Sequence, residues 1–399
     1  MARRNGGFIG TDGLDAPDPP TAITPTAGDA QVSVAFTAPT DTGTSAITGF
    51  VAQVSTDGTA YSAGSGTGTS SPIVVSSLTN GTAYTAKVWA INAYGTSSPS
   101  DASSSVTALG DRALFTYYHA GRIYGSTFNI STTGNSTNFG YTSVPSHQYA
   151  GGFSSYTRAV VAADDGTTSS AINYTTISTT GSWATFGRLF SSATNGFTGA
   201  SNSVTGLIFG GNNSSTAEIE SLTIATLGNA TGFGSLTVSR GFGGACASST
   251  RALFAGGGPD YSDPKNTIDY VTIASSGNAV DFGNLTANIY GLTGTGSSTR
   301  GLFAGGSNSS TYLNVIQYVT IASTGNASDF GDLTVARQYF GATSNATRAV
   351  FGGGNSPGAF SNVIDYVTIA STGNASDFGD LNAAKQGYVG MSQCHGGLA

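Results

Sequence analysis

Histidine and cysteine, which commonly ligate transition metals, are scarce in this 399-residue sequence. The three histidines, His119, His147 and His395, stand in dissimilar sequence contexts. Cys246 and Cys394 lie far apart and have no metal-ligand spacing. Two buried free thiols are expected, with a disulfide between them as the alternative. The sequence therefore predicts no metal site.

Carboxylates suited to general acid and base chemistry are also few. Glu218 and Glu220 are the only glutamates, so a carbohydrate-active enzyme with paired carboxylates is a minor alternative. Asp260 and Asp263 have oxygen ligands that suit calcium, but aspartates in such stretches more often cap turns. No catalytic residue is assigned. The chain is expected to be no enzyme and to bind no cofactor.

Arginine begins a strand-like run in five places, with Gly206 at the corresponding sixth position. Because charged residues make up only 9% of the sequence, this recurrence needs a cause. Repetition in nearly every unit favours hydrogen bonding between units over a ring of ligand-binding cations. The arginines are Arg112, Arg158, Arg251, Arg300 and Arg348.

The composition is typical of an all-β protein. Hydrophobic residues make up 38%, and the 58 glycines suit many short strands joined by tight turns. No apolar pattern with the helical period persists over three turns. The net charge of −7 disfavours nucleic-acid binding, which needs clustered Lys and Arg.

The amino-terminal segment is basic but has no apolar core typical of a secretory signal. No run of about 18 apolar residues predicts a transmembrane helix. We therefore expect synthesis in a host cytoplasm, without export by the usual route and without a membrane partner.

A six-fold repeat extends from about Arg112 to Ala399. Each unit has a Phe-Gly dipeptide, an isoleucine nine residues before the phenylalanine, and a glycine between the two. Successive phenylalanines are 47 to 49 residues apart, a regularity that chance does not produce. The phenylalanines are Phe139, Phe186, Phe233, Phe282, Phe330 and Phe378.

Each unit contains four strand-like runs. In the last full unit these cover residues 338–343, 348–351, 363–369 and 378–381. The third run alternates with period two and is rich in β-branched residues. Four strands in about 45–50 residues is the size of one blade of a β-propeller.

The order of residues in a unit resembles the kelch repeat. That order is an arginine, a Gly-Gly pair closing a strand, a tyrosine in the next strand and then an aromatic strand. It occurs as Arg240, Gly256-Gly257, Tyr270 and Phe282, and as Arg337, Gly352-Gly353, Tyr366 and Phe378. The chain departs from the family by having Phe-Gly where tryptophan is usual, and the first two units lack the Gly-Gly pair. The resemblance implies six kelch-like blades.

Kelch-like propellers often close by exchanging a strand between their ends. The first unit opens at Arg112 with a run that aligns to a second strand, and residues 385–391 align with residues 337–341. We therefore expect residues 385–391 to pair beside residues 112–116. The expected domain is a six-bladed β-propeller over residues 110–399, closed by the C-terminal strand.

Residues 17–109 resemble a fibronectin type III domain. The run from Gln31 to Phe36 alternates like a half-buried strand, and the spacing of Leu78 and Tyr84 matches the tyrosine corner of that family. Phe36 stands where many members carry tryptophan. The resemblance implies a β-sandwich. The fold class is therefore all-β, a fibronectin type III sandwich followed by a propeller.

Residues 1–16 form a short Gly-rich arm that is expected to be flexible. Its two arginines and an apolar pair are the candidate anchor to a partner protein, the alternative being a disordered terminus. The anchor residues are Arg3, Arg4, Phe8 and Ile9.

The loops between the second and third strands vary in length and hold aromatic residues. Exposed aromatics on loops above a rigid scaffold suit sugar stacking or protein docking, although unconstrained drift of these loops is an alternative. These loops are expected to form one rim of the propeller. The candidate binding residues of this rim are Tyr117, Tyr118, His119, Tyr124, Tyr261, Tyr312 and Phe360.

In style and architecture the chain resembles virion structural proteins of tailed bacteriophages, particularly those of marine cyanobacteria. The resemblance implies a non-enzymatic tail, baseplate, fibre or capsid-surface protein, present in multiple copies per particle. Its expected partners are other virion proteins, through the amino-terminal arm, and a host-surface glycan. The alternative is a glycan-binding, lectin-like adhesin.

Overall fold

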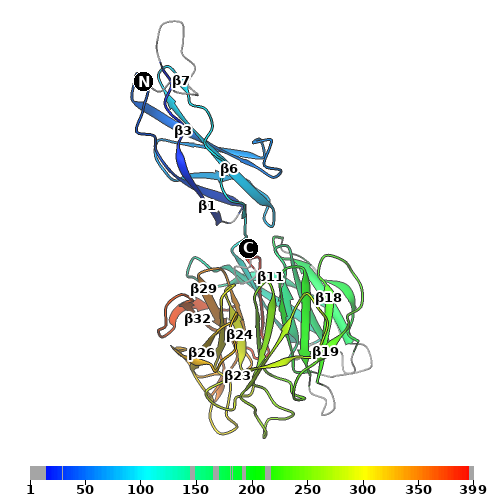
Figure 1. The fold of residues 1–399 in the computed structure, drawn as a ribbon. Coiled ribbons are helices and arrows are strands. Elements are labelled where there is room, and N and C mark those ends of the chain that lie inside the picture. Colours follow the sequence, from blue (N-terminus) through cyan, green and yellow to red (C-terminus); the bar gives the residue numbers. More distant parts are fainter. Residues whose placement is uncertain are drawn as a thin grey trace. The chain divides into compact units, whose positions relative to one another are not determined.

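The computed structural model describes residues 15–28, 30–143, 149–164, 170–179, 181, 183–190, 195–211 and 217–394. Within these residues all helix and strand structure is β-strand, so the expected all-β class is confirmed. The chain divides into two compact units, with Gly110 in the first and Asp111 in the second (Figure 1).

The first unit consists of two antiparallel sheets. One has the strand order β1-β2-β5, and the other has the order β4-β3-β6-β7 with β8 added to β6. The strands are β1 (Thr21–Gly28), β2 (Gln31–Thr37), β3 (Ile47–Ser55), β4 (Gly64–Gly68), β5 (Ile73–Ser76), β6 (Ala83–Asn92), β7 (Gly95–Thr96) and β8 (Val106–Thr107).

Alternating burial along β2, β3 and β6 builds the core of the first unit. Every second side chain of β2 is buried, which is what a strand with one face on a core requires. The Phe36 and Phe50 rings lie 4.7 Å apart between centroids within this core. Buried Tyr84 accepts a hydrogen bond through its hydroxyl from the Thr79 N–H at 3.1 Å, as the tyrosine-corner spacing implies.

In its described residues the second unit contains six four-stranded antiparallel sheets. Each sheet is named here by its inner strand. The sheets are β12 (Gly151–Ser154), β13 (Arg158–Asp164), β14 (Ser170–Thr176) and β15 (Ala184–Arg188); β16 (Phe197–Ser201), β17 (Thr205–Gly210), β18 (Glu218–Thr223) and β19 (Thr231–Ser235); β20 (Gly244–Ala247), β21 (Arg251–Ala255), β22 (Thr267–Thr272) and β23 (Val280–Asn284); β24 (Thr293–Gly296), β25 (Arg300–Ala304), β26 (Val315–Thr320) and β27 (Ser328–Asp332); β28 (Gly341–Ser344), β29 (Arg348–Gly352), β32 (Val363–Thr368) and β33 (Ser376–Asp380); and β34 (Val389–Ser392), β9 (Arg112–His119), β10 (Arg122–Asn129) and β11 (Thr137–Ser143).

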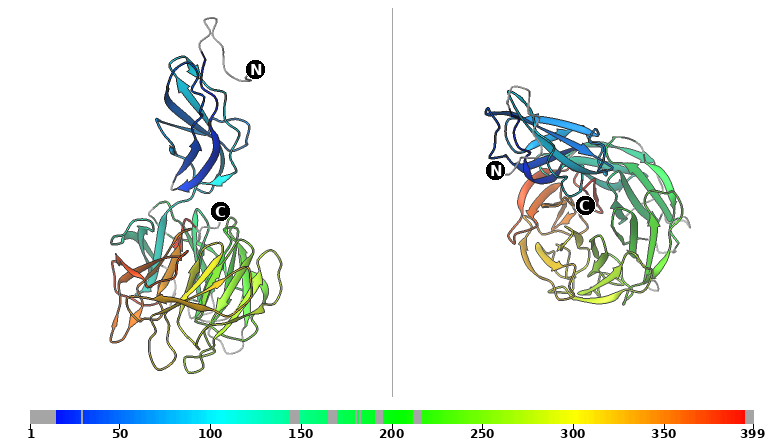
Figure 2. Two further views of the ribbon diagram at one scale, coloured as in Figure 1. Left: turned by 60° about the vertical axis from the view of Figure 1, so that its left-hand side comes forward. Right: turned by 45° about the horizontal axis from the view of Figure 1, so that its top comes forward.

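The six inner strands are neighbours in chain order. Each of β12, β16, β20 and β24 contacts the inner strand that follows it, and β34 contacts both β28 and β12. The sheets accordingly lie around a common centre (Figure 2). A short hairpin of β30 (Asn355–Ser356) and β31 (Ala359–Phe360) adds structure to one loop, where the sequence predicts none.

The C-terminal strand β34 completes the sheet of the first repeat, which also contains β9, β10 and β11. Val389 lies opposite Thr116, Gly390 opposite Phe115 and Met391 opposite Leu114 in an antiparallel pair. This is the pairing expected from the alignment of the chain ends, although the strand begins at Val389, four residues after Lys385. The last and first repeats therefore share one sheet.

Glycines let the inner strands approach one another closely. A Cβ on Gly199 would lie 2.7 Å from the Gly152 oxygen, and one on Gly390 would lie 2.3 Å from the Ala342 oxygen. Such distances are shorter than any side chain tolerates. The small residues of the inner strands are therefore a packing requirement at the centre of the unit.

Backbone hydrogen bonds join the residues that precede the inner strands. The N–H of Gly196 donates to the Tyr149 oxygen at 3.1 Å, and the same pattern continues through four further bonds of 2.7–2.9 Å. All members have φ between 54° and 74°, the left-handed region. We call this set the mouth ring: Tyr149, Gly196, Phe242, Gly291, Tyr339 and Gly387.

Side-chain hydroxyls join the inner strands at their other ends. The Ser201 hydroxyl donates to the Ser154 oxygen, the Ser154 hydroxyl to the Ser392 oxygen, and the Ser392 hydroxyl to the Ser344 oxygen, each at 2.9 Å. Hydrogen bonds thus link neighbouring sheets at both ends of their inner strands.

The two cysteines are buried thiols that form no disulfide, as expected. Burial raises the pKa of the Cys246 thiol to about 12, so this thiol stays protonated at neutral pH. Its sulfur lies within an apolar cluster that includes Leu253 and Phe303. Cys246 therefore acts as a core residue.

Substituting alanine for Gly196 should destabilise the second unit more than the same change at Gly121. Both glycines have a left-handed φ, of 74° and 79°, but only at Gly196 would the Cβ meet another group, the Phe242 ring at 2.5 Å. We expect a loss of about 3 kcal/mol for Gly196→Ala, from backbone strain plus overpacking, and about 1 kcal/mol for Gly121→Ala. Calorimetric unfolding measures the difference. Equal effects would show that the mouth ring tolerates a side chain there.

Candidate functional site

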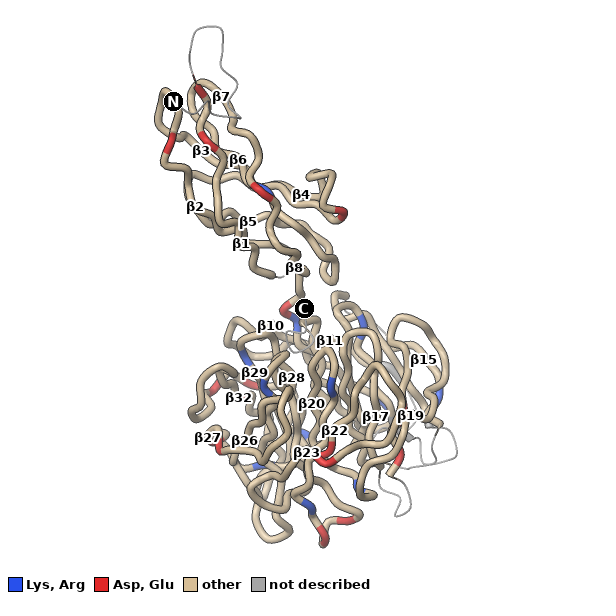
Figure 3. The backbone as a smooth tube through the Cα atoms, in the orientation of Figure 1, with Lys and Arg blue, Asp and Glu red and all other residues tan. Residues whose placement is uncertain are grey.

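The recurring arginines join neighbouring sheets. Arg158 donates through Nη1 to the Ile224 and Ala225 oxygens of the next sheet, both at 2.8 Å, and its guanidinium lies 4.9 Å from the centroid of the Tyr174 ring. The other four arginines donate to the corresponding carbonyls of the sheet that follows each of them. The structural role expected for them is confirmed. Charged residues are sparse along the backbone (Figure 3), so these five are a large share of the cations.

Aromatic side chains fill the centre of the mouth ring. Tyr149, Phe242 and Tyr339 form a triangle, with ring centroids 4.8 to 5.8 Å apart. They alternate around the ring with Gly196, Gly291 and Gly387, whose missing side chains leave room for them. Tyr290 stacks on Phe242 at 4.9 Å. The centre of this end is therefore occupied by side chains.

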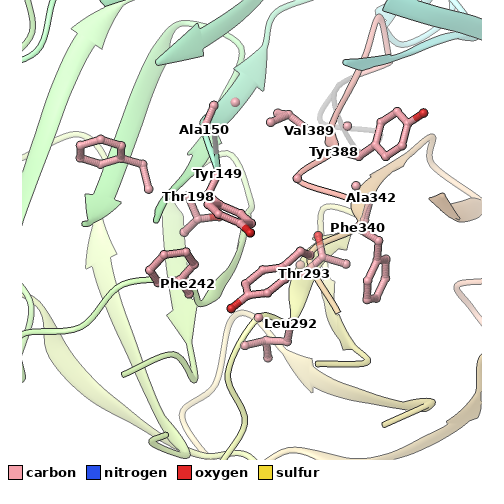
Figure 4. Close-up of a pocket in the computed structure, with 18 of the residues that line it drawn as sticks. Tyr149, Ala150, Thr198, Phe242, Leu292, Thr293, Phe340, Ala342, Tyr388 and Val389 are labelled. Atoms are coloured by element: carbon pink, nitrogen blue, oxygen red, sulfur yellow. The ribbon is translucent and has the colours of Figure 1, made fainter. Parts of the chain in front are cut away.

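A small cavity lies along the starts of the inner strands, beside the aromatic triangle. Its volume is about 90 Å³, and its lining includes many glycines. Figure 4 shows Tyr149 and Phe242 on one side of it, with Phe340 and Tyr388 on the other. A space of this size holds a few water molecules but is well below the roughly 300 Å³ of the smallest ordinary ligand pockets. The centre is therefore a poor candidate for a ligand site.

A larger cavity, the rim cavity, opens beside the mouth ring. Its volume is about 250 Å³, and it is lined by Tyr118, His119, Tyr149, Phe360, Lys385, Gln386 and Gly387. The Gln386 side-chain amide donates to the Tyr149 hydroxyl at 2.9 Å, which holds the amide at the wall. Aromatic faces, an amide, an imidazole and an ammonium group thus meet in one place.

Three of the residues predicted to bind lie in this cavity. Tyr118 and His119 come from the end of β9, and Phe360 comes from β31 in a different sheet. Phe360 is 48% exposed although it is a large apolar residue. The fold therefore gathers residues that are more than 240 positions apart in the sequence.

The other predicted residues make contacts outside the rim cavity. Tyr117 stacks on Tyr124 at 5.3 Å and lies 5.1 Å from the Tyr388 ring. Tyr261 packs against Tyr290 at 5.7 Å and donates to the Ser309 oxygen at 3.3 Å. These side chains belong to the same end of the unit but do not join the cavity.

Tyr312 is likewise engaged elsewhere, since its hydroxyl accepts a hydrogen bond from the Asn355 amide at 3.2 Å. Asp260 accepts hydrogen bonds from the Ser262 N–H and hydroxyl, and Asp263 pairs with Lys265. Asp260 therefore caps a turn, the interpretation favoured from the sequence, whereas Asp263 forms an ion pair. Among the described residues no group of three or more His, Cys, Asp or Glu is placed to hold a metal ion.

The candidate anchor residues Arg3, Arg4, Phe8 and Ile9 lie outside the described residues, as do His147 and His395. Within the described part of the chain, no helix is long and apolar enough to span a membrane.

Lys385 occupies a position that is a buried arginine in two other repeats. Arg240 pairs with Asp269 at 2.9 Å, and Arg337 pairs with Asp365 at 3.0 Å, with all four side chains buried. In the sheet of β34 the residue corresponding to these aspartates is Ser126, which hydrogen-bonds Asn382. Lys385 has therefore lost the carboxylate partner that its counterparts have.

The sequence analysis missed Tyr149, Lys385 and Gln386 as site residues. One signal was available, because residues 385–391 align with residues 337–341 and a lysine there replaces a buried arginine. Tyr149 carried no signal, since its place in the cavity depends on a left-handed backbone and on the neighbouring Gly387.

No protein-family model matches the chain, and no curated protein is similar to it.

Replacing Arg348 by methionine should destabilise the second unit by about 2–3 kcal/mol, from a lost charged hydrogen bond and a lost cation–π contact. Arg348 donates to the Ile130 oxygen at 3.0 Å and lies 4.3 Å from the centroid of the Tyr366 ring, so it links the last repeat to the first. The exposed Arg188 is the control, and Arg188→Met should leave the unfolding temperature within about one degree. If both variants behave alike, the arginine bonds between sheets contribute nothing measurable.

Alkaline pH should destabilise the second unit, because of the tyrosines in and beside the mouth ring. Burial raises the pKa of Tyr290 to about 12 and raises the pKa values of Tyr149 and Tyr339 above the ordinary 10.0. The unfolded chain loses these protons near pH 10 whereas the folded chain keeps them, so stability is intact below about pH 9 and falls as pH rises towards 12. Unfolding temperatures at about pH 9 and 11 measure this loss. Tyr290→Phe should reduce it, and an unchanged pH profile in that variant would contradict the assignment.

Proposed function

We propose that residues 17–109 form a fibronectin type III domain and that residues 110–399 form a six-bladed kelch-like β-propeller closed by the C-terminal strand. The two-sheet core and the Tyr84 hydrogen bond support the first assignment. Six four-stranded sheets, inner strands that are neighbours in chain order, and the pairing of β34 with β9 support the second.

On this architecture the chain is a non-enzymatic structural protein of a tailed-bacteriophage particle, at the tail, baseplate, a fibre or the capsid surface. Its rim makes contacts with neighbouring proteins or with the host surface. The observation that carries this proposal is the rim itself, where aromatic residues gather on a scaffold whose arginines are used between sheets. Such a scaffold suits presentation of a contact surface.

The amino-terminal arm, with Arg3, Arg4, Phe8 and Ile9, is the proposed attachment to other virion proteins, and several copies are present per particle. A glycan-binding adhesin is the second candidate, and the rim cavity is the observation that favours it. The two candidates differ in where the protein resides.

Mass spectrometry of purified phage particles tests the proposal directly. We expect peptides from this chain in particles that have been purified through a density gradient, at a constant ratio to the major capsid protein. Complete absence from particles, together with presence on a cell surface, would favour the adhesin.

Particles assembled with a chain that lacks residues 2–14 should contain none of this protein, because the proposed anchor is gone. A chain with Phe190→Ala, a change far from the arm in sequence, should be incorporated normally and serves as the control. Quantitative mass spectrometry of both particle preparations measures incorporation. Normal incorporation of the deleted chain would place the anchor elsewhere.

A further inference from the structure

The repeats of the chain provide an internal comparison for Lys385. Where the equivalent position is arginine, the facing position is aspartate, as in Arg240 with Asp269. In the β24 sheet the residue equivalent to Arg240 is the apolar Ile289. The facing residue there is the neutral Gln317, which accepts a hydrogen bond from the Thr286 N–H at 2.7 Å. In these repeats the cation and the anion occur together or are both absent. The β16 sheet differs, because its facing position keeps the buried Glu220, which accepts a hydrogen bond from the Phe190 N–H at 2.7 Å, although the residue equivalent to Arg240 is Thr194. Burying one without the other costs several kcal/mol.

Lys385 keeps the positive charge of Arg240 and Arg337, whereas its facing residue is the uncharged Ser126. In the part of the chain that the structure describes, Lys385 forms no ion pair. The side chain is half-buried and lines the rim cavity. A cation without an internal counter-ion at the wall of a cavity is available to an anion from outside.

Among the described residues that line the cavity there is no aspartate or glutamate, although the chain as a whole has a net charge of −7. The exposed His119 and the Gln386 amide add hydrogen-bonding groups that suit hydroxyl and carboxylate oxygens. The cavity therefore favours a ligand that is anionic and rich in hydroxyls.

The aromatic lining and the size narrow the ligand class. Tyr118 and Phe360 present apolar faces on which the C–H face of a sugar ring can stack. A volume of about 250 Å³ is below the roughly 300–1,000 Å³ of pockets that enclose drug-sized molecules, so it suits one sugar ring of a longer chain.

We propose that the rim cavity binds an acidic sugar residue of a surface polysaccharide, with the sugar carboxylate paired to Lys385 and the ring stacked on Phe360. This inference rests on the proposed function, in which the rim contacts a host surface. It adds the chemical class of the ligand and the residues that select it.

The test is an NMR titration of the full chain with a panel of short saccharides that contain glucuronic, galacturonic or sialic acid. The methyl esters of the same saccharides, which carry no charge, are the ligand controls. We expect at least one acid to bind, its ester to bind at least tenfold more weakly, and its affinity to fall with added salt. If no acid of the panel binds, or if the esters bind equally well, the proposal is overturned.

Matched variants locate the site. Lys385→Met and Phe360→Ala should each weaken binding of the acid at least tenfold. Lys265→Met removes a lysine that pairs with Asp263, and Phe190→Ala removes a phenylalanine that is 67% exposed, so neither should change the affinity. Unfolding temperatures of all four variants check that each folds. Unchanged affinity in both cavity variants would overturn the proposal.

This experiment is independent of where the protein resides. A chain that binds the acid but is absent from phage particles keeps the cavity and refutes the virion proposal. A chain that is present in particles but binds no member of the panel keeps the virion proposal and refutes the cavity.

Discussion

The second unit depends on the pairing of its last strand with its first repeat. Because the first repeat begins at a second strand, β9 has no inner neighbour within its own repeat, and β34 supplies one from the far end of the chain. The same strand lies against β28 and β12, so it also fills the place between the last inner strand and the first. Unpaired strand edges promote aggregation, which makes this pairing a condition for a soluble fold.

The pairing of the last strand also brings Gly387 into the mouth ring, where its N–H donates to the Tyr339 oxygen. Each member after Tyr149 donates its N–H to the oxygen of the preceding member, and all six have a left-handed backbone. Glycine adopts that backbone without strain, whereas Tyr149, Phe242 and Tyr339 adopt it at a cost of about 1–2 kcal/mol each. Their rings meet in the centre and recover apolar contact. The alternation of aromatic residue and glycine is therefore a steric solution, since six large side chains cannot share one axis.

Most of the described cations of the second unit bond to groups within that unit. The recurring arginines bond the carbonyls of the next sheet, and Arg240 and Arg337 are buried with aspartates. These cations are not available to a partner. Lys385 differs because the exchanged strand brings it to a sheet whose facing residue is Ser126. Closure by strand exchange thus leaves Lys385 without the carboxylate that Arg240 and Arg337 have.

The sequence predicts much of the fold and part of the site. The period of the Phe-Gly dipeptide, the strand-like runs within a unit and the alignment of the chain ends are local patterns, and the strands of the structure follow them. Tyr118, His119 and Phe360 could be predicted as uncommon residues at positions expected to be variable loops, although the structure places Tyr118 and His119 in β9 and Phe360 in β31. Tyr149 could not be predicted, because its position depends on a backbone conformation and on a neighbour more than 230 residues away. Tyr261 and Tyr312 were predicted to bind, yet both side chains hydrogen-bond within the rim, a contact that no sequence pattern reveals.

Removal of residues 385–399 tests the dependence on the last strand most directly. Size-exclusion chromatography with light scattering and calorimetry of the truncated chain measure its association state and the unfolding of its second unit. The account predicts aggregated protein or loss of the cooperative transition of that unit, with the transition of the first unit preserved. A monomeric truncated chain whose second unit unfolds cooperatively at the original temperature would contradict it.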